Sequence, residues 1–316
     1  MGGRVGRRDF LKGAATCTLA AASYEIISGL GPLGELGEAW AVESAKPVIA
    51  VAKKGAPEAM ARAAVKALGG MSKFVGRGDV VIVKPNIGWD RTVEQAANTN
   101  PDVVKAVVKM CLEAGAKKVR VMDKTCNDPR RCYKRSGIKD AVESIGNPAV
   151  SVEFIDERNF VTKQIKGGKS LTEWTFCKDA FEADKLINVP IAKHHNAARL
   201  TMSLKNIMGL LGGNRGNIHR DLDRNIAELN SVMKFDLVVL DAVRILTANG
   251  PQGGRLQDVK ETNVVVAGKD PVAIDSYAAT LFGITGYDVP HVVYANELKL
   301  GEIDLKKVKI INAEIG

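Results

Sequence analysis

The stretch NPDVVKAVVKMCLEAGAKKVRVMD, residues 100–123, holds a complete helix-to-strand unit. Asn100 is a favourable N-cap, Pro101 suits the first helical position, and Gly115 follows the last residue with helical spacing. The apolar run VRVMD then predicts a strand that ends at Asp123. A second apolar run, DVVIVKPN at residues 79–86, precedes the helix, so this part of the chain predicts two strands joined by a helix.

The same alternation continues along the chain. Further strand-like runs are PVIAVAK, ADKLINVP, FDLVVLDAV, TNVVVAG and VKIINAE, with helical patterns between them, including one that opens at Asp270-Pro271. This order predicts a single α/β domain over residues 42–316, with a largely parallel sheet and helices on both of its faces. Residues 158–220 are more polar and predict an irregular insertion, with a hairpin turn at the GGK of residues 167–169.

The N-terminus predicts an export signal. GRRDFLKG at residues 6–13 resembles a twin-arginine motif, and a mildly apolar stretch and the small residues of AWA at 39–41 follow it. Residues 1–41 are therefore predicted to be a signal that the twin-arginine export machinery reads, which would place the folded mature chain in the periplasm or elsewhere outside the cytoplasm. An amphipathic N-terminal helix is the alternative. The stretch is too weakly apolar for a permanent membrane span, and we expect no span in the mature chain.

Net charge and aromatic content limit the kinds of partner. The net charge is +9, but only 5% of residues are aromatic, and basic and aromatic residues do not alternate as they do on single-strand binding surfaces. Nucleic-acid binding is therefore disfavoured. A basic chain of this kind suits an anionic small molecule or an anionic membrane surface.

Polar residues at the ends of strand-like runs indicate where chemistry would occur, because ligands of open parallel sheets gather beyond the carboxyl ends of the strands. Each such residue alone is also typical of a loop or a helix cap. Several together predict a cleft for an anionic ligand, with binding residues Lys84, Asn86, Asp123, Asn206, Arg215 and His219 and catalytic residues Lys193, His194, His195 and Lys205.

The adjacent histidines 194 and 195 are unusual in a chain with four histidines. Adjacent side chains of a strand point to opposite faces, so we expect one of the two to face the cleft. His195 and His219 are candidate metal ligands, with Asp123 or Asp241 completing the set, although no helical metal-binding spacing is present. General acid–base chemistry is favoured, because a neighbouring lysine would keep the imidazole neutral. The alternative is one capping and one solvated histidine.

The cysteines argue against an iron–sulfur cluster. No C-x-x-C-x-x-C run occurs, and Cys111 lies within a helical pattern, where a buried thiol is the ordinary interpretation. Cys126 and Cys132 flank NDPRR in an expected loop and are a candidate disulfide in an oxidising compartment.

Several segments together resemble the family catalogued as domain of unknown function 362. They are KPN at 84–86, residues 99–123, LINVPIAKHHNAARLTMSLKNIMGLL at 186–211, R-x-x-x-H at 215–219 and DPVAIDSYAATLFG at 270–283. The resemblance implies an uncharacterised protein in a family whose other members include iron–sulfur proteins. The core of the sequence also distantly resembles the N-terminal half of nickel-pincer lactate racemases, which use histidines and a cofactor-bearing lysine.

The sequence thus predicts an exported protein that binds an anionic small molecule or a metal-containing cofactor. If it is an enzyme, we expect proton transfer next to a carboxylate or redox chemistry on the cofactor. A non-catalytic binding module or a structural subunit of a surface assembly is the first alternative. An iron–sulfur electron-transfer protein is the second. The oligomeric state is left open.

Overall fold

The computed structural model describes residues 46–316. The predicted signal at residues 1–41 therefore lies outside the described residues. Within the described part of the chain, no helix combines the length and apolar character that a membrane crossing requires.

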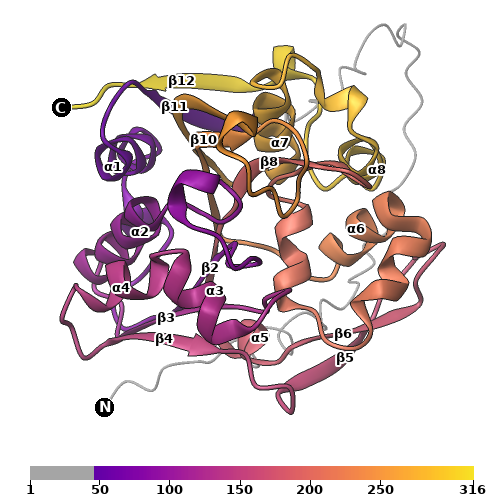
Figure 1. Cartoon of the computed structure of the whole chain (residues 1–316), viewed down its shortest axis with the longest axis horizontal. Coiled ribbons are helices and arrows are strands. Elements are labelled where there is room, and N and C mark those ends of the chain that lie inside the picture. Colours follow the sequence, from indigo (N-terminus) through magenta and orange to yellow (C-terminus); the bar gives the residue numbers. More distant parts are fainter. Residues whose placement is uncertain (1–45) are drawn as a thin grey trace, which may run out of the picture. The chain divides into compact units, whose positions relative to one another are not determined.

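The described chain folds around a mixed sheet in the order β12-β1-β11-β10-β7-β2-β3-β4, with β8 and β9 paired beyond β10 (Figure 1). All neighbours along this order pair in parallel except β11, which runs antiparallel to β1 and β10. The strands are β1 (Val48–Lys53), β2 (Val80–Pro85), β3 (Lys118–Asp123), β4 (Val150–Phe154), β7 (Lys185–Val189), β8 (Ile191–His195), β9 (Arg199–Thr201), β10 (Leu237–Leu246), β11 (Val259–Gly268) and β12 (Lys309–Ala313). The largely parallel sheet is confirmed.

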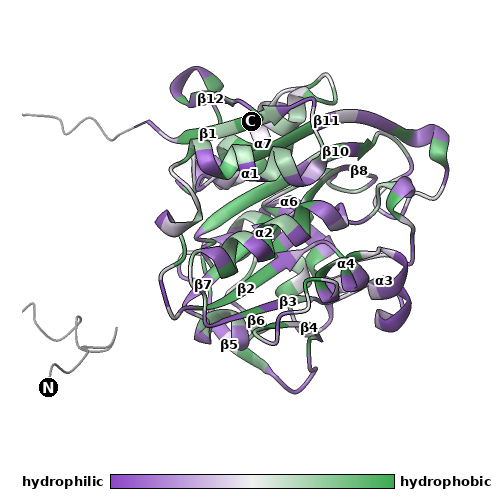
Figure 2. Cartoon of the chain, turned by 90° about the vertical axis from the view of Figure 1, so that its left-hand side faces the viewer, coloured by the Kyte–Doolittle hydropathy of each residue, from purple (hydrophilic) through white to green (hydrophobic). Residues whose placement is uncertain are grey.

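Helices cover both faces of this sheet, as predicted. One hydrophobic core joins the sheet to α1 (Pro57–Ala67), α2 (Pro101–Glu113) and α4 (Ile138–Glu143). A second core lies on the opposite face, under α6 (Leu222–Asn230), α7 (Pro271–Thr280) and α8 (Pro290–Glu297) (Figure 1). Because both faces of the sheet are covered, hydrophobic residues dominate the central strands (Figure 2). This explains why their sequences are continuous apolar runs.

Local signals set the helix starts where they were predicted. The Asn100 side chain accepts a hydrogen bond from the backbone N–H of Asp102, and Pro101 occupies the first turn of α2. Asp270 caps α7 by accepting from the N–H of Ala273. Asp270 turns the end of β11 directly into α7, whereas a longer segment joins the end of β2 to the cap at Asn100.

The predicted insertion contains a separate two-stranded hairpin. Strands β5 (Phe160–Gln164) and β6 (Glu173–Cys177) pair antiparallel on either side of the predicted GGK turn, and α5 (Asp179–Glu182) leads back to the main sheet. Pro190 then separates β7 from β8, and both strands pair with β10. The 3₁₀ segments η3 (Lys205–Leu210) and η4 (Arg215–Asp221) complete this part of the chain.

One loop was predicted wrongly. Residues 127–131 were expected to form a loop between two bonded cysteines, but Pro129–Arg135 forms helix α3, capped by the Asp128 side chain. This helix carries Cys132 inward, where its thiol faces the carbonyl oxygen of Gly88 at 3.8 Å. Cys126 stays on the exposed loop, and both thiols are free. The candidate disulfide is therefore not formed in the structure.

Candidate functional site: a basic pocket at the carboxyl ends of the strands

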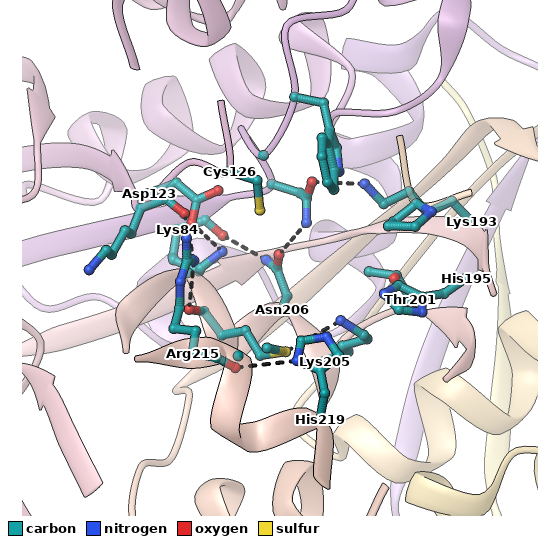
Figure 3. Close-up of a pocket in the computed structure, with 18 residues that line it drawn as sticks. Lys84, Asp123, Cys126, Lys193, His195, Thr201, Lys205, Asn206, Arg215 and His219 are labelled. Carbon is teal, nitrogen blue, oxygen red and sulfur yellow. Dashed lines mark hydrogen bonds and ion pairs between the residues drawn. The ribbon is translucent and has the colours of Figure 1, made fainter. Parts of the chain in front are cut away.

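A pocket of about 320 Å³ lies beyond the carboxyl ends of β2, β3 and β8 (Figure 3). The segments η3 and η4 form its opposite side. Its lining residues are Lys84, Asn86, Gly88, Trp89, Asp123, Lys124, Cys126, Lys193, His195, Thr201, Lys205, Asn206, Met208, Gly209, Arg215, Gly216, His219 and Pro251. Four lysines and an arginine thus accompany a single carboxylate, Asp123, among these residues, so the lining is predominantly basic.

The ends of β2 and β3 form a buried ion pair. Lys84 Nζ lies 2.8 Å from Asp123 Oδ1, and both side chains are almost completely buried. Lys84 also donates to the carbonyl oxygen of Pro85 at 2.7 Å, and Asp123 Oδ2 accepts from the N–H of Ile87 at 2.6 Å. Burial lowers the pKa of Lys84, and the Asp123 carboxylate opposes this shift. Asp123, the one carboxylate among the described lining residues, is therefore already paired.

Gly209 makes room for this ion pair. A Cβ at position 209 would overlap Asp123 Oδ1 and lie 2.6 Å from Lys84 Nζ. Because β-carbons in proteins do not approach heavy atoms this closely, only glycine allows the η3 backbone to lie against the pair. The close approach also brings the N–H of Lys124 to the carbonyl oxygen of Gly209, at 2.8 Å.

Three asparagine side chains connect the strand ends to η3. Asn86 Nδ2 donates to Asn206 Oδ1 at 2.9 Å, and Asn206 Nδ2 donates to Asn188 Oδ1 at 2.8 Å. Asn188 in turn donates to the carbonyl oxygen of Ser203 at 3.0 Å. This row of amides fixes the wall of the pocket between its lysines, and Asn188 does so from beneath the pocket surface.

Lys193 and Lys205 are buried without a carboxylate partner among the described residues. Lys193 Nζ donates to Asn86 Oδ1 at 3.1 Å and to the carbonyl oxygen of Ala97. Lys205 Nζ contacts only the thioether sulfur of Met208, at 3.3 Å. Burial lowers the pKa of Lys193 to about 7, assisted by the charges of Lys205 and Lys84. Burial and the Arg215 guanidinium lower the pKa of Lys205 to about 8.

The two adjacent histidines point in different directions, as the strand geometry predicted. His195 lines the pocket. His194 is turned away from it, and its Nδ1 accepts from the N–H of Gly250 at 3.1 Å. His194 is therefore a positioning residue for the loop at Gly250, and the structure does not support its predicted catalytic role.

Hydrogen bonds fix the tautomer of His195. Its Nδ1 accepts from the N–H groups of Ala197 and Ala198, at 3.1 and 3.0 Å. Burial, together with the charges of Lys205 and Lys193, lowers the pKa of His195 to about 2. The ring is thus neutral and carries its proton on Nε2. His195 was predicted to accept a proton, but in this tautomer it is a hydrogen-bond donor.

His219 has the opposite tautomer. Its Nδ1 lies 3.3 Å from the carbonyl oxygen of Arg215. A carbonyl oxygen can only accept, so Nδ1 carries a proton in this contact, and Nε2 is left as the ring nitrogen without a hydrogen-bond partner among the described residues. His219 is exposed at the rim of the pocket (Figure 3). Of the two pocket histidines, His219 is therefore the one suited to act as a base.

Arg215 is engaged by the protein itself. Its guanidinium donates to the carbonyl oxygens of Lys124 at 3.0 Å, Thr125 at 2.7 Å and Met208 at 3.3 Å. It was predicted to bind the ligand directly. In the structure it joins η4 to the loop after β3 and contributes its positive charge to the pocket from there.

Two buried aspartates position the pocket from behind. Asp275 accepts from the N–H groups of Ser203 and Leu204, at 2.8 and 3.0 Å, immediately before Lys205. Burial raises the pKa of Asp275 to about 7. Asp241, considered above as a metal ligand, accepts from the N–H of Asn100 at 2.7 Å and from that of Val243 at 2.9 Å. Neither aspartate lines the pocket.

The donor set does not fit a metal ion held by His195 and His219. Among the described residues, no group of three or more histidine, cysteine, aspartate or glutamate side chains has a metal-binding arrangement. Ligation through Nε2 of His195 would require the proton on Nδ1, which already accepts two backbone hydrogen bonds. We therefore assign no metal-binding role to this pair.

Sequence reasoning missed part of the lining. Lys124 and Cys126 directly follow the end of β3, so the rule that selected Asp123 would also have selected them. Met208 and Gly209 lie beside the predicted Lys205 and Asn206 on η3. Trp89, Thr201 and Pro251 reach the pocket from separate loops and strands, and no local pattern marks them.

The fold and pocket define an α/β protein with a basic site at the carboxyl ends of its strands. Residues 81–280 match the family described as Domain of unknown function (DUF362), and the chain belongs to this family. A curated relative, Thylakoid-associated protein sll1697 of Synechocystis sp., is 26% identical over 253 residues, or 76% of this chain and 74% of that protein.

Two solved structures were also compared. One is a protein from Thermotoga maritima, with 13% identity and a TM-score of 0.42 over 69% of this chain. The other is the lactate racemase apoprotein from Thermoanaerobacterium thermosaccharolyticum, with 14% identity and a TM-score of 0.43 over 71% of this chain. The matched regions cover 58% and 55% of those two chains.

Proposed function

We propose that this protein binds a small molecule with a carboxylate or phosphate group in the basic pocket, after export through the twin-arginine route. One observation carries the binding proposal. Lys193 and Lys205 are buried in the wall of one pocket, and neither has a carboxylate partner among the described residues. Buried ammonium groups are costly without a counter-charge. An anionic ligand would supply that charge.

Lys84 could also pair with an anionic ligand, but Asp123 already neutralises the charge of this lysine. His195 adds a neutral Nε2–H donor beside the two unpaired lysines. One carboxylate or phosphate has enough oxygens to accept from several such donors at once, and hydrogen bonds to charged groups are roughly twice as strong as neutral ones. The pocket therefore selects for charge and for oxygen acceptors.

The experiment is calorimetric titration of the purified chain with L-lactate and with inorganic phosphate, using glycerol as a neutral control. Lys193→Met and Lys205→Met should each weaken anion binding by about tenfold or more, since a hydrogen bond to a charged group contributes about 1.5–3 kcal/mol. Lys134→Met is the matched control, because Lys134 is exposed on α3 and pairs with Asp140. Absence of anion binding, or equal losses in all three variants, would refute the proposal.

The tautomers of His195 and His219 support acid–base chemistry on the bound ligand. His195 presents a donor and His219 an acceptor to one pocket. Together they would polarise a ligand oxygen and accept a proton from a neighbouring atom. Exchange of a carbon-bound ligand hydrogen with solvent deuterium, followed by proton NMR, tests this. Exchange that His219→Gln abolishes would support an enzyme, whereas binding without exchange would support the non-catalytic alternative.

A further inference from the structure

The two unpaired lysines of the pocket are held differently. Lys193 Nζ has two oxygen partners, Asn86 Oδ1 and the carbonyl oxygen of Ala97. Among the described residues, the hydrogen-bond partner of Lys205 Nζ is the sulfur of Met208, which is a weak acceptor. The first amine is oriented by the protein as a donor. The second has its nitrogen left available to a ligand.

The surroundings of Lys205 make its amine easier to deprotonate than that of an exposed lysine. Its side chain is 8% exposed, and burial lowers its pKa to about 8. The guanidinium of Arg215 acts in the same direction, whereas Asp223 and Cys126 oppose it. A desolvated lysine beside other cationic groups is the arrangement that activates an amine as a nucleophile towards carbonyl compounds.

We propose that Lys205 forms an imine with the carbonyl carbon of a 2-oxo acid whose carboxylate is held by Lys193. This inference rests on the proposed function and names its ligand class. Lys193 and Lys205 line the same pocket, so a single ligand can present a carboxylate to the first and a carbonyl carbon to the second. A 2-oxo acid has them on adjacent carbons. A phosphate ester without a carbonyl gives the amine no carbon to attack.

The step balances without a further reactant. The lone pair of Lys205 Nζ attacks the carbonyl carbon, a C–N bond forms, and one proton passes from the nitrogen to the carbonyl oxygen, which becomes a hydroxyl. The hydroxyl takes up a second proton as the C–O bond breaks and water leaves, and the nitrogen gives up its remaining proton as the C=N bond forms. His195 and His219 line the same pocket as Lys205, and in the proposed step His195 Nε2–H donates a hydrogen bond to the oxygen while His219 Nε2 accepts the proton from nitrogen.

The experiment traps the imine. The purified full chain is mixed with pyruvate as the 2-oxo acid and with sodium borohydride, which reduces an imine to a stable secondary amine. Peptide mass spectrometry should find the adduct at Lys205. The adduct should be lost in Lys205→Arg, which keeps the positive charge, and retained in Lys134→Arg. In Lys193→Met it should require higher pyruvate concentrations, because the carboxylate loses its partner.

A parallel titration with L-lactate separates the two proposals, since lactate has the carboxylate but no carbonyl. Lactate binding with no trapped pyruvate would refute the imine and leave the anion site standing. Failure of both anions to bind would refute the proposed function itself. An adduct spread over surface lysines, or unchanged in a folded Lys205→Arg variant, would also overturn the assignment. Circular dichroism and the thermal unfolding midpoint establish that each variant is folded.

Discussion

Lys84 and Lys205 are the same residue type at opposite walls of one pocket, and the protein treats them differently. Lys84 lies at the end of a central strand and has a buried carboxylate at 2.8 Å. Lys205 lies on η3, and within the described part of the chain its amine has a thioether as its hydrogen-bond partner, at 3.3 Å. The paired lysine holds two strand ends together. In the proposed function, the unpaired one keeps its charge, or its lone pair, for a ligand.

The presence or absence of a carboxylate partner distinguishes these lysines better than their burial does. Lys84, Lys193 and Lys205 are all less than a tenth exposed, so burial alone would group them. What differs is whether the protein supplies the counter-charge. The Lys84–Asp123 pair and the unpaired Lys205 can be mutated separately. The free energy of unfolding should fall in the first case and rise in the second.

The largest effect is expected for the paired side. Asp123→Ala leaves the Lys84 ammonium buried without its partner, and should lower the free energy of unfolding by about 3–5 kcal/mol. Urea denaturation measures this. Asp140→Ala is the control, since Asp140 forms an exposed pair with Lys134 and its loss should cost about 1 kcal/mol or less. Equal losses in the two variants would contradict the structural role of the Lys84–Asp123 pair.

The unpaired side should respond in the opposite direction. Lys205→Met replaces a buried ammonium that has no carboxylate partner with an apolar chain of similar length, and should raise the free energy of unfolding of the ligand-free protein by about 1–4 kcal/mol. The same denaturation experiment serves as the measurement. A large loss of stability in this variant would show that Lys205 is structural after all.

A smaller loss is expected where the backbone approaches the ion pair. In Gly209→Ala the added Cβ would overlap Asp123 Oδ1, so the pair or η3 must move. Overpacking of this kind costs about 1–3 kcal/mol. Gly88→Ala is the control, because a Cβ there would meet only Asn86 Oδ1, at 3.4 Å. Thermal unfolding of both variants gives the comparison, and a stable Gly209→Ala protein would show that the contact is not tight.

The pH dependence should distinguish binding from stability. Lys193 and Lys205, with pKa values of about 7 and 8, attract an anion only while protonated. Anion affinity should therefore fall as pH rises through 7 to 8, by up to about tenfold per pH unit for each proton required. The nearby Lys84–Asp123 pair, Arg215 and Asp223 also contribute to the field at these amines.

The stability of the ligand-free protein should change the other way. In the unfolded chain these lysines have pKa values of about 10.4. Between about pH 7 and pH 10 the unfolded chain therefore binds more protons than the folded one. The contribution of these lysines to stability then rises with pH. Calorimetry and denaturation from pH 6 to 9 measure both trends, and the double variant Lys193→Met with Lys205→Met should lose both.

The smallest effect is expected for Cys126. Since its thiol is free in the structure, Cys126→Ser should change the free energy of unfolding by less than about 0.5 kcal/mol, with or without a reductant. Removal of a disulfide typically costs about 2–5 kcal/mol. A loss of that size under oxidising conditions would restore the bond predicted from the sequence.

Local signals made much of the fold predictable. Continuous apolar runs, the Asn100 and Asp270 caps and the prolines after them act over one turn of chain, and the structure has each element where they indicated. Helix α3 escaped prediction because it is short and was hidden by the interpretation of its flanking cysteines. Its own signals, Asp128 as N-cap and Pro129 after it, were present.

The candidate site was predictable only as a set of strand ends. Because parallel strands share one carboxyl edge, Lys84, Asp123 and Lys193 had to lie at that edge. Which of them would neutralise one another depends on distances across the sheet, and no sequence pattern contains those distances. Arg215 shows the same limit, since its carbonyl partners come from loops that only the folded chain brings together.

By itself, the sequence determined the α/β layers, the family and the edge of the sheet where polar residues gather, because these follow from local periodicity and strand order. Only the tertiary structure decided that His195 faces the pocket and His194 does not. It also decided that two backbone N–H groups make His195 a donor and that Lys205 lacks the carboxylate Lys84 has. The reason is physical: a protonation state and a charge partner depend on groups within a few ångströms, and folding alone selects those groups.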